Sequence, residues 1–262
     1  MQKLKIYQAD AFADKLFGGN PAAVVPLQSW LSDDILQKIA AENNLAETAY
    51  YLPSGEDFAL RWFTPGVEVK LCGHATLAAA HIIFTETDYG KNAVNFQTKS
   101  GTLTVEKDEN GYRMDFPADK IERIENPPAG IAEGLGVEIK EVWKGDTDYM
   151  VVLDNEAAVR DLKPDFRALN TYSARGTIVT APGEETDFIS RCFYPQAGID
   201  EDPTTGSAHT TMTPYWANRL GKNKLTARQI SRRIGNLLCE LKGERVLLSG
   251  QAVTYLRGEI WV

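Results

Sequence analysis

The stretch RWFTPGVEVKLCGHATLAAA at residues 61–80 decides the fold of this chain. Apolar residues at 67, 69 and 71 alternate with polar ones, which predicts a strand. A turn at Cys72–Gly73 follows, and a helix then begins at His74. Such a helix start presents unpaired backbone N–H groups and the positive end of the helix dipole, which suits a carboxylate or a phosphate.

A second copy of this pattern occurs later in the chain. RCFYP at 191–195 repeats RWFTP at 61–65, and Gly206–Ser207–Ala208 follows where Gly73–His74–Ala75 stood. Further matched pairs keep the same order: Thr48–Pro53 with Thr177–Pro182, and Gly101–Glu106 with Gly235–Glu240. The sequence therefore predicts two homologous halves, each made of strands with a glycine-headed helix. The alternative is one irregular α+β domain in which the two pentapeptides coincide by chance.

The length of 262 residues suits two domains, each large enough to bury its own core. We expect them at 1–117 and 118–250, with a strand from 251–262 returning to pair in the first domain. Three prolines within Pro117–Pro128 indicate the crossing between the halves. The helix beginning ATLAAAHIIF at 75–84 is apolar almost all round, so we expect it to be enclosed rather than to lie on a surface.

Composition excludes several classes of function. The formal net charge is −8, and no cluster of lysine or arginine indicates a nucleic-acid surface. Three cysteines without metal spacing favour the reduced cytoplasm, and no apolar run approaches membrane-spanning length. The three histidines form no metal-binding pattern, and neither a Walker loop nor a GxGxxG motif occurs, so we expect no metal and no cofactor.

Two polar residues stand out in the first half. Glu47 lies at a strand start between apolar neighbours, which would partly desolvate its carboxylate and make it a stronger base; its counterpart in the second half is a small residue near Gly176. The alternative is a glutamate at a strand end that points to water. Asn20 belongs to GGNP at 18–21, which is either a loop that serves the site or a simple turn. Ser207 is expected to cap its helix.

Five segments together resemble the PhzF-like (phenazine biosynthesis-like) isomerases, which share the fold of diaminopimelate epimerase. They are DAF…GGNPAAVV at 10–25, AETAYYL at 46–52, RWFTPGVEVKLCGHAT at 61–76, RCFYPQAGIDEDPTTGSAH at 191–209 and PYWANRLG at 214–221. The resemblance implies an α+β fold of two pseudo-symmetric domains. Each is a curved, mostly antiparallel sheet around a central helix, with the active site in the cleft between the domains.

The resemblance also implies a function. It is that of a cofactor-independent isomerase that moves a proton next to the carboxylate of a small amino-acid-like or cyclic acid. Glu47 matches the catalytic glutamate of the family, and His74, Asp202 and Ser207 match its other catalytic positions. Substrate-binding positions are Gly73, Gly206 and Asn20. A homodimer is expected by resemblance, and unpaired hairpin edges at 93–116 fit the need for a partner.

Two other functions stay open. The related epimerases use one cysteine at each helix head, and here Cys72 occupies the first position but Thr205 the second. A threonine hydroxyl is a poor acid or base near neutral pH, which disfavours a symmetric two-thiol racemase and leaves Cys72 as a small packed residue. A racemase or epimerase using Glu47 or Cys72 is one alternative, and a non-catalytic protein-binding member of the fold is the other.

Overall fold

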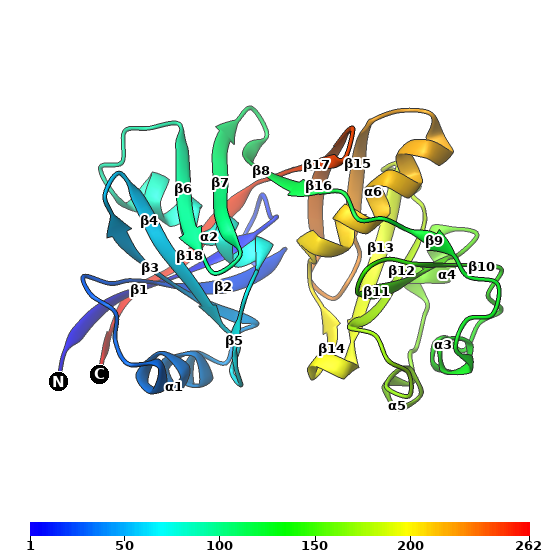
Figure 1. The fold of residues 1–262 in the computed structure, drawn as a ribbon, viewed down its shortest axis with the longest axis horizontal. Coiled ribbons are helices and arrows are strands. Elements are labelled where there is room, and N and C mark those ends of the chain that lie inside the picture. Colours follow the sequence, from blue (N-terminus) through cyan, green and yellow to red (C-terminus); the bar gives the residue numbers. More distant parts are fainter. The chain divides into compact units, whose positions relative to one another are not determined.

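The computed structural model describes all residues from 1 to 262 and has an α+β fold. The chain divides into two compact units (Figure 1). Unit 1 comprises Met1–Asp115 together with Ser249–Val262, and unit 2 comprises Phe116–Leu248. Two strands, β8 (Gly111–Pro117) and β17 (Arg245–Gly250), carry the chain from one unit to the other.

Unit 1 is a sheet with one long central helix and one short outer helix. Its elements are β1 (Lys3–Ala11), β2 (Asn20–Pro26), α1 (Asp33–Asn43), β3 (Glu47–Ser54), β4 (Asp57–Phe63), β5 (Glu68–Val69), α2 (Gly73–Glu86), β6 (Ala93–Thr98), β7 (Gly101–Asp108) and β18 (Ala252–Trp261). The last strand returns from the C-terminal end of the chain and pairs antiparallel with β1 along its whole length. Ser32 caps α1, and Asn44 ends it in the left-handed conformation.

Unit 2 repeats this plan with additional short helices. Its elements are β9 (Glu122–Arg123), α3 (Ala129–Leu135), β10 (Glu141–Lys144), β11 (Asp148–Val152), α4 (Glu156–Arg160), α5 (Phe166–Leu169), β12 (Gly176–Pro182), β13 (Phe188–Tyr194), a 3₁₀ turn (Pro195–Ala197), β14 (Ile199–Asp202), α6 (Gly206–Leu220), β15 (Lys224–Gln229) and β16 (Gly235–Lys242). Gly221 ends α6 with φ +64°, a left-handed conformation that favours glycine.

The strand pairings are the same in the two units. In unit 1, β2 and β3 are parallel, β3, β4 and β5 are antiparallel neighbours, and β4 runs parallel to β6. In unit 2, β11 and β12 are parallel, β12, β13 and β14 are antiparallel neighbours, and β13 runs parallel to β15. Even the register agrees, because Thr48 opposes Phe63 and Thr177 opposes Phe193. The predicted pseudo-symmetric, mostly antiparallel fold is confirmed.

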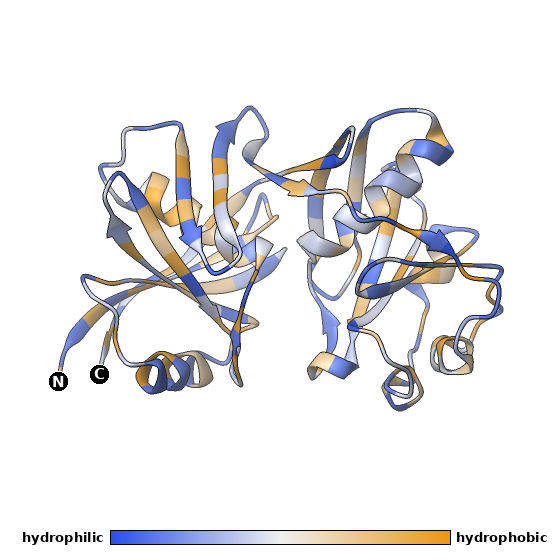
Figure 2. Ribbon diagram, in the orientation of Figure 1, coloured by the Kyte–Doolittle hydropathy of each residue, from blue (hydrophilic) through white to orange (hydrophobic).

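Helix α2 forms the centre of unit 1. Every side chain from His74 to Phe84 is buried, and the helix contacts β1, β2, β3, β7 and β18. Orange and blue segments alternate along strands such as β4 and β6, so each strand turns one apolar face inward (Figure 2). An apolar helix enclosed by a curved sheet leaves its N-terminus as the place where polar groups can gather.

The same bidentate ion pair stabilises both copies of the RxFxP segment. Arg61 donates from Nε and Nη2 to the two carboxylate oxygens of Glu68, both at 2.8 Å. Arg191 donates in the same way to Glu201 at 2.8 and 2.9 Å. The counterpart of Glu68 is therefore Glu201, and Asp202 takes the place of Val69. Each ion pair holds the strand that leads into a central helix.

The predicted strand before α2 is shorter than the sequence pattern indicates. Only Glu68–Val69 forms β5, and the side chains of Val67 and Leu71 are exposed. The strand predicted from the period-two pattern over 67–71 was therefore too long. The hydrogen bonds from Arg61 to Glu68 fix this segment, and it has no buried apolar face.

Glu68→Gln should lower the free energy of unfolding at pH 7 by about 1–3 kcal/mol, because the charge-assisted hydrogen bonds to Arg61 are lost. The hydrogen bonds from Arg61 lower the pKa of Glu68 from 4.5 to about 2. The stability from this pair is therefore fully present above pH 4.5 and is lost as the pH falls through about 2.

Chemical denaturation of Glu68→Gln and wild type between neutral and acidic pH tests this expectation. The matched control is Glu56→Gln, because the ion pair of Glu56 with Lys91 is exposed. Equal losses in the two variants would contradict a special role for the Arg61–Glu68 pair.

Candidate functional site

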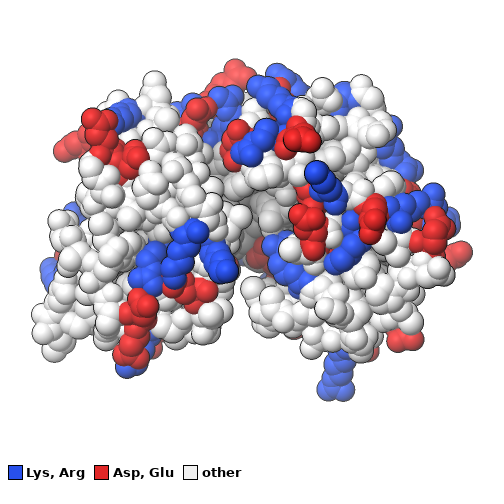
Figure 3. Space-filling view, in the orientation of Figure 1, with Lys and Arg blue, Asp and Glu red and all other residues white.

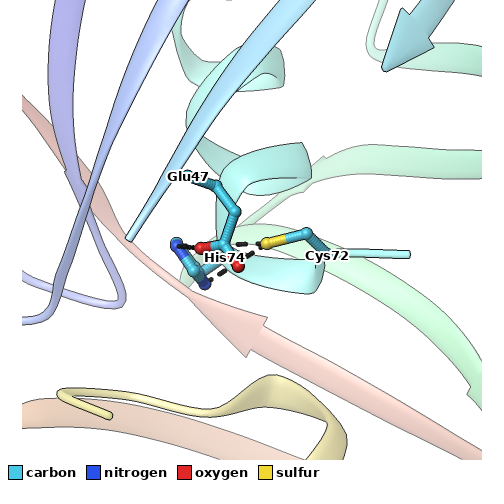
Figure 4. A group of neighbouring side chains, drawn as sticks. All are labelled: Glu47, Cys72 and His74. Carbon is cyan, nitrogen blue, oxygen red and sulfur yellow. Dashed lines mark hydrogen bonds and ion pairs between the residues drawn. The ribbon is translucent and has the colours of Figure 1, made fainter. Parts of the chain in front are cut away.

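Three side chains of different chemistry converge at the N-terminus of α2 (Figure 4). Glu47 is the first residue of β3, Cys72 is the N-cap of α2, and His74 is the second residue of the helix. Glu47 Oε2 lies 3.0 Å from His74 Nε2, and Cys72 Sγ lies 3.5 Å from His74 Nδ1 and 4.0 Å from Nε2. The sequence predicted that Cys72 is only a small packed residue. Its contact with His74 shows that it is also part of this polar cluster.

Asn20 holds the other side of the His74 ring. Its side-chain amide nitrogen lies 3.2 Å from Nδ1, and the residue is fully buried at the start of β2. If the amide donates, Nδ1 accepts and the proton of a neutral ring is on Nε2, the nitrogen that lies 3.0 Å from Glu47 Oε2. The resemblance placed Asn20 among the substrate-binding residues. In the structure its side chain contacts His74, another of the residues expected in the site.

The local fold explains why Asn20 and Glu47 approach His74 together. Strands β2 and β3 are parallel, with Ala22 opposite Glu47, so their first residues lie at the same edge of the sheet. Gly19, just before β2, has φ +55°, and a Cβ there would lie 2.0 Å from the carbonyl oxygen of Ala11. Only glycine allows this close approach, and it gives GGNP a structural role.

Burial acts differently on the two titratable neighbours of Glu47. Burial, assisted by the charge of Glu47, raises the pKa of the Cys72 thiol to about 11. Cys72 is therefore a thiol near neutral pH. Burial opposes charging of His74, but contacts with Cys72 and Glu47 outweigh it and raise the pKa of His74 well above 6.5. Since Cys72 is neutral, the carboxylate of Glu47 is the group that stabilises the imidazolium.

Glu47 keeps one carboxylate oxygen without a hydrogen bond. Oε2 is buried, and although it lies at ion-pair distance from His74 Nε2, the pair is not aligned as a hydrogen bond. A buried acceptor without an aligned donor is uncommon, and a catalytic role is one explanation for it. The alternative of a solvent-directed Glu47 does not fit a side chain that is 13% exposed.

In unit 2, Asp202 belongs to a buried polar network at the N-terminus of α6. Thr205, the N-cap residue, donates its hydroxyl to Asp202 Oδ2 at 2.5 Å and its backbone N–H to the Gln229 side chain at 2.8 Å. The Gln229 amide and the Ser231 hydroxyl donate to the backbone carbonyl of Asp202. These bonds fix the carboxylate of Asp202, a residue only 8% exposed.

Ser207 does not cap α6, which corrects the expectation from sequence. Helix α6 begins one residue earlier, at Gly206, so the N-cap is Thr205. The Ser207 hydroxyl instead accepts a hydrogen bond from Arg175 Nη1 at 3.0 Å. Arg175 also forms an ion pair with the buried Asp148, which fixes its guanidinium. No pattern in the sequence indicated Arg175, since it precedes β12 without a motif.

The residues expected from sequence thus form one set in each unit. Glu47 and Asn20 both contact His74 in unit 1, where Gly73 begins α2. Asp202, Gly206 and Ser207 belong to unit 2, where Gly206 begins α6. In neither helix does the N-cap side chain accept a hydrogen bond from the first turn. Backbone N–H groups at both helix starts are therefore not occupied by a capping side chain.

Positive and negative side chains are interspersed on the visible face of each unit (Figure 3). None of the helices is long and apolar enough to cross a membrane.

Comparison with known proteins points to one family. The family model described as phenazine biosynthesis-like protein matches residues 9–258. An uncharacterized isomerase of Pseudomonas aeruginosa is 50% identical over 98% of this chain and 99% of its own. The crystal structure of a PhzF-family phenazine biosynthesis protein from Enterococcus faecalis is 44% identical, with a TM-score of 0.96 over the full length of both chains.

A more distant likeness concerns the fold alone. A hydroxyproline epimerase from Agrobacterium vitis is 10% identical, with a TM-score of 0.61 over 98% of this chain and 92% of that one. The fold of this chain is therefore similar to that of this epimerase.

Glu47→Gln should lower the pKa of His74, because removal of the carboxylate charge removes the stabilisation of the imidazolium. NMR titration of the three histidine rings in metal-free buffer would measure this. His81 and His209, whose pKa values burial lowers to about 4, are internal controls and should not move. An unchanged His74 titration in the variant would contradict a charge interaction with Glu47.

Proposed function

The chain is an isomerase of the phenazine biosynthesis-like (PhzF) family, and from this premise we propose that it moves a proton next to the carboxylate of a small acid. Glu47 is the proposed general base. The observation that carries the proposal is the carboxylate oxygen of Glu47, which is buried, has no aligned hydrogen-bond donor and lies 3.0 Å from His74 Nε2.

In this proposal, Glu47 removes a proton from the carbon next to the substrate carboxylate and then returns it at another carbon. A carboxylate acts as a general base when its oxygen lies within hydrogen-bond reach of the proton that it removes. Negative charge develops on the substrate as the C–H bond breaks. Backbone N–H groups and the dipole at the start of a helix stabilise such charge, and α2 begins directly after Cys72.

His74 has a supporting role in this scheme. Its Nε2 faces Glu47 and its Nδ1 contacts Asn20, so the ring is held on both sides. A charged or neutral His74 can hold the carboxylate in one orientation, and it can supply a proton when the product forms. Asp202 and Ser207 are proposed to assist by resemblance; Ser207 accepts from Arg175, which leaves its own O–H proton available to a ligand.

The epimerase alternative rests on the shared fold. Cys72 and Thr205 are the N-cap residues of α2 and α6, so they occupy equivalent positions. The Thr205 hydroxyl donates to Asp202, and no second thiol is present at that position. This favours a single carboxylate base over a two-thiol racemase. Analysis of product chirality distinguishes the two, and a protein-binding member without activity would catalyse neither reaction.

Glu47→Gln should reduce proton exchange by about 10²–10⁴-fold, the usual contribution of general acid–base catalysis, because the amide fits the site but cannot accept the proton. The measurement is deuterium uptake from D₂O at the C–H next to the carboxylate, by mass spectrometry, across a panel of small acids. Glu42→Gln on the exposed side of α1 is the control. Asp202→Asn should reduce exchange less. Exchange at the wild-type rate in Glu47→Gln would reject Glu47 as the base.

For the oligomeric state we propose a homodimer that uses the β18 side of unit 1. Tyr255, Leu256 and Trp261 on β18 are large apolar side chains that remain exposed, and Phe17 packs edge-on against Tyr255. Large apolar side chains that remain exposed along one strand suit a protein contact surface.

Light scattering should give twice the 29.0 kDa chain mass at micromolar concentration, and Tyr255→Lys should shift the protein toward the single-chain mass. Val67→Lys replaces an exposed apolar residue elsewhere in unit 1 and should leave the mass unchanged. A wild-type protein that runs at 29.0 kDa contradicts the dimer.

A further inference from the structure

Arg175 in unit 2 has a guanidinium group that the protein holds in place but does not cover. Its Nε donates to Asp148 Oδ1 at 2.9 Å and its Nη2 donates to Asp148 Oδ2, and Asp148 is buried. Its backbone N–H donates to the carbonyl oxygen of Thr147 at 2.8 Å, and the Tyr194 ring lies 5.1 Å from the guanidinium carbon. The side chain is nevertheless 38% exposed, so a ligand can approach it.

The contacts of Arg175 leave hydrogen-bond donors for a ligand. A guanidinium has five N–H groups, and the bonds to Asp148 and Ser207 use three of them, one on each nitrogen. Nη1 and Nη2 therefore keep one N–H each. The Ser207 hydroxyl accepts from Nη1 at 3.0 Å, so its single proton is available to another acceptor. Two neighbouring side chains thus offer donors together.

The framework shared by the two units does not require the ion pair of Arg175 with Asp148. The registers of the parallel strands place Asp148 where unit 1 has Ala22, and Arg175 where unit 1 has Ala46. Two small apolar residues therefore suffice at these positions for the same strand pairing. A buried ion pair is also weak evidence for stability, because desolvation offsets the attraction of the charges. Both facts favour a role in binding.

The start of α6 adds to the attraction for an anion. Ser207 is the second residue of this helix, and the N-cap residue Thr205 donates its hydroxyl to Asp202 instead of capping the first turn. The N–H groups and the dipole at a helix start favour a carboxylate. Because Asp148 balances the charge of Arg175, a ligand here is recognised by directed hydrogen bonds more than by net charge.

We propose that Arg175 and Ser207 bind a carboxylate group of the substrate, and that Arg175 determines the preference for an acid over its neutral amide. One carboxylate oxygen accepts from an N–H of Arg175, and the other accepts from the Ser207 hydroxyl. A planar guanidinium held in one orientation suits a planar carboxylate. The assignment of this carboxylate to the substrate of the isomerase rests on the proposed function, whereas the affinity of the subsite for a carboxylate does not.

Acetate is the probe for this subsite, because it carries a carboxylate and almost nothing else. Titration of the protein with acetate at constant ionic strength should shift the side-chain N–H signals of Arg175 in NMR spectra in a saturable way. Acetamide, the neutral analogue, should leave them unchanged. The signals of Arg228, which donates to Glu185 at 2.8 Å elsewhere in unit 2, should not move with either compound. Absence of a saturable shift at Arg175, or an equal shift with acetamide, would overturn the proposal.

A conservative variant tests whether the guanidinium itself is needed. Arg175→Lys keeps a positive charge beside Asp148 but lacks the planar fork, so it cannot serve Asp148 and a carboxylate together. Acetate should bind at least about 10-fold more weakly, as measured by the saturable shift of the Ser207 backbone N–H signal. Arg228→Lys is the matched control and should bind acetate like wild type. Wild-type affinity in Arg175→Lys contradicts the assignment.

Substrate preference separates a binding role from a merely structural one. For an acid that exchanges its C–H in D₂O, wild type should prefer the acid over its amide, as measured by kcat/KM. Arg175→Lys should lower this preference by about 10-fold or more, because the lost hydrogen bond is made to the carboxylate. A general distortion of the site would instead slow both compounds equally. An unchanged preference therefore counts against Arg175 as the residue that reads the carboxylate.

The subsite and the proposed base can fail separately. Exchange that depends on Glu47, with Arg175 signals that acetate does not move, would support the isomerase and reject the subsite. A saturable acetate shift at Arg175, without any exchange that depends on Glu47, would support the subsite and reject the proposed base.

Discussion

Enclosure of an apolar helix is the constraint on which unit 1 depends. Helix α2 is buried on every side from His74 to Phe84, so the strands must curve around it. A helix in such a position can meet polar chemistry only at its ends. The bidentate pair of Arg61 and Glu68 fixes the short strand that delivers the chain to this N-terminus, and β2 and β3 bring Asn20 and Glu47 to the same edge. The site is thus a product of the packing of the core.

The two units share their framework but not their chemistry. The ion pair of Arg61 with Glu68 is repeated by Arg191 with Glu201, and the strand registers agree. At the helix starts, however, Cys72 and His74 are replaced by Thr205 and Ser207. Unit 1 holds an imidazole beside a carboxylate, whereas unit 2 holds Asp202 within a network of neutral donors. The two units therefore have the same strand framework and ion pair but different side chains at the starts of their central helices.

Much of this could be predicted from sequence because it depends on short-range patterns. The repeated RxFxP segment predicted the pseudo-symmetry, the apolar run at 75–84 predicted the enclosed helix, and the family motifs predicted the isomerase class. The contact between Cys72 and His74 and the bond from Arg175 to Ser207 could not be predicted, because both depend on side-chain directions at turns. The exposed side chains of Val67 and Leu71 show that alternation alone does not establish a buried strand face.

Gly176 in unit 2 occupies the position that Glu47 occupies in unit 1, as the registers of β3 and β12 show. A Cβ at Gly176 would lie 2.2 Å from the Tyr194 ring and 2.4 Å from the carbonyl oxygen of Phe193. Even alanine there would force the backbone of β13 to move. An acid at position 176 to match Glu47 would therefore require Tyr194 and the backbone of β13 to rearrange as well.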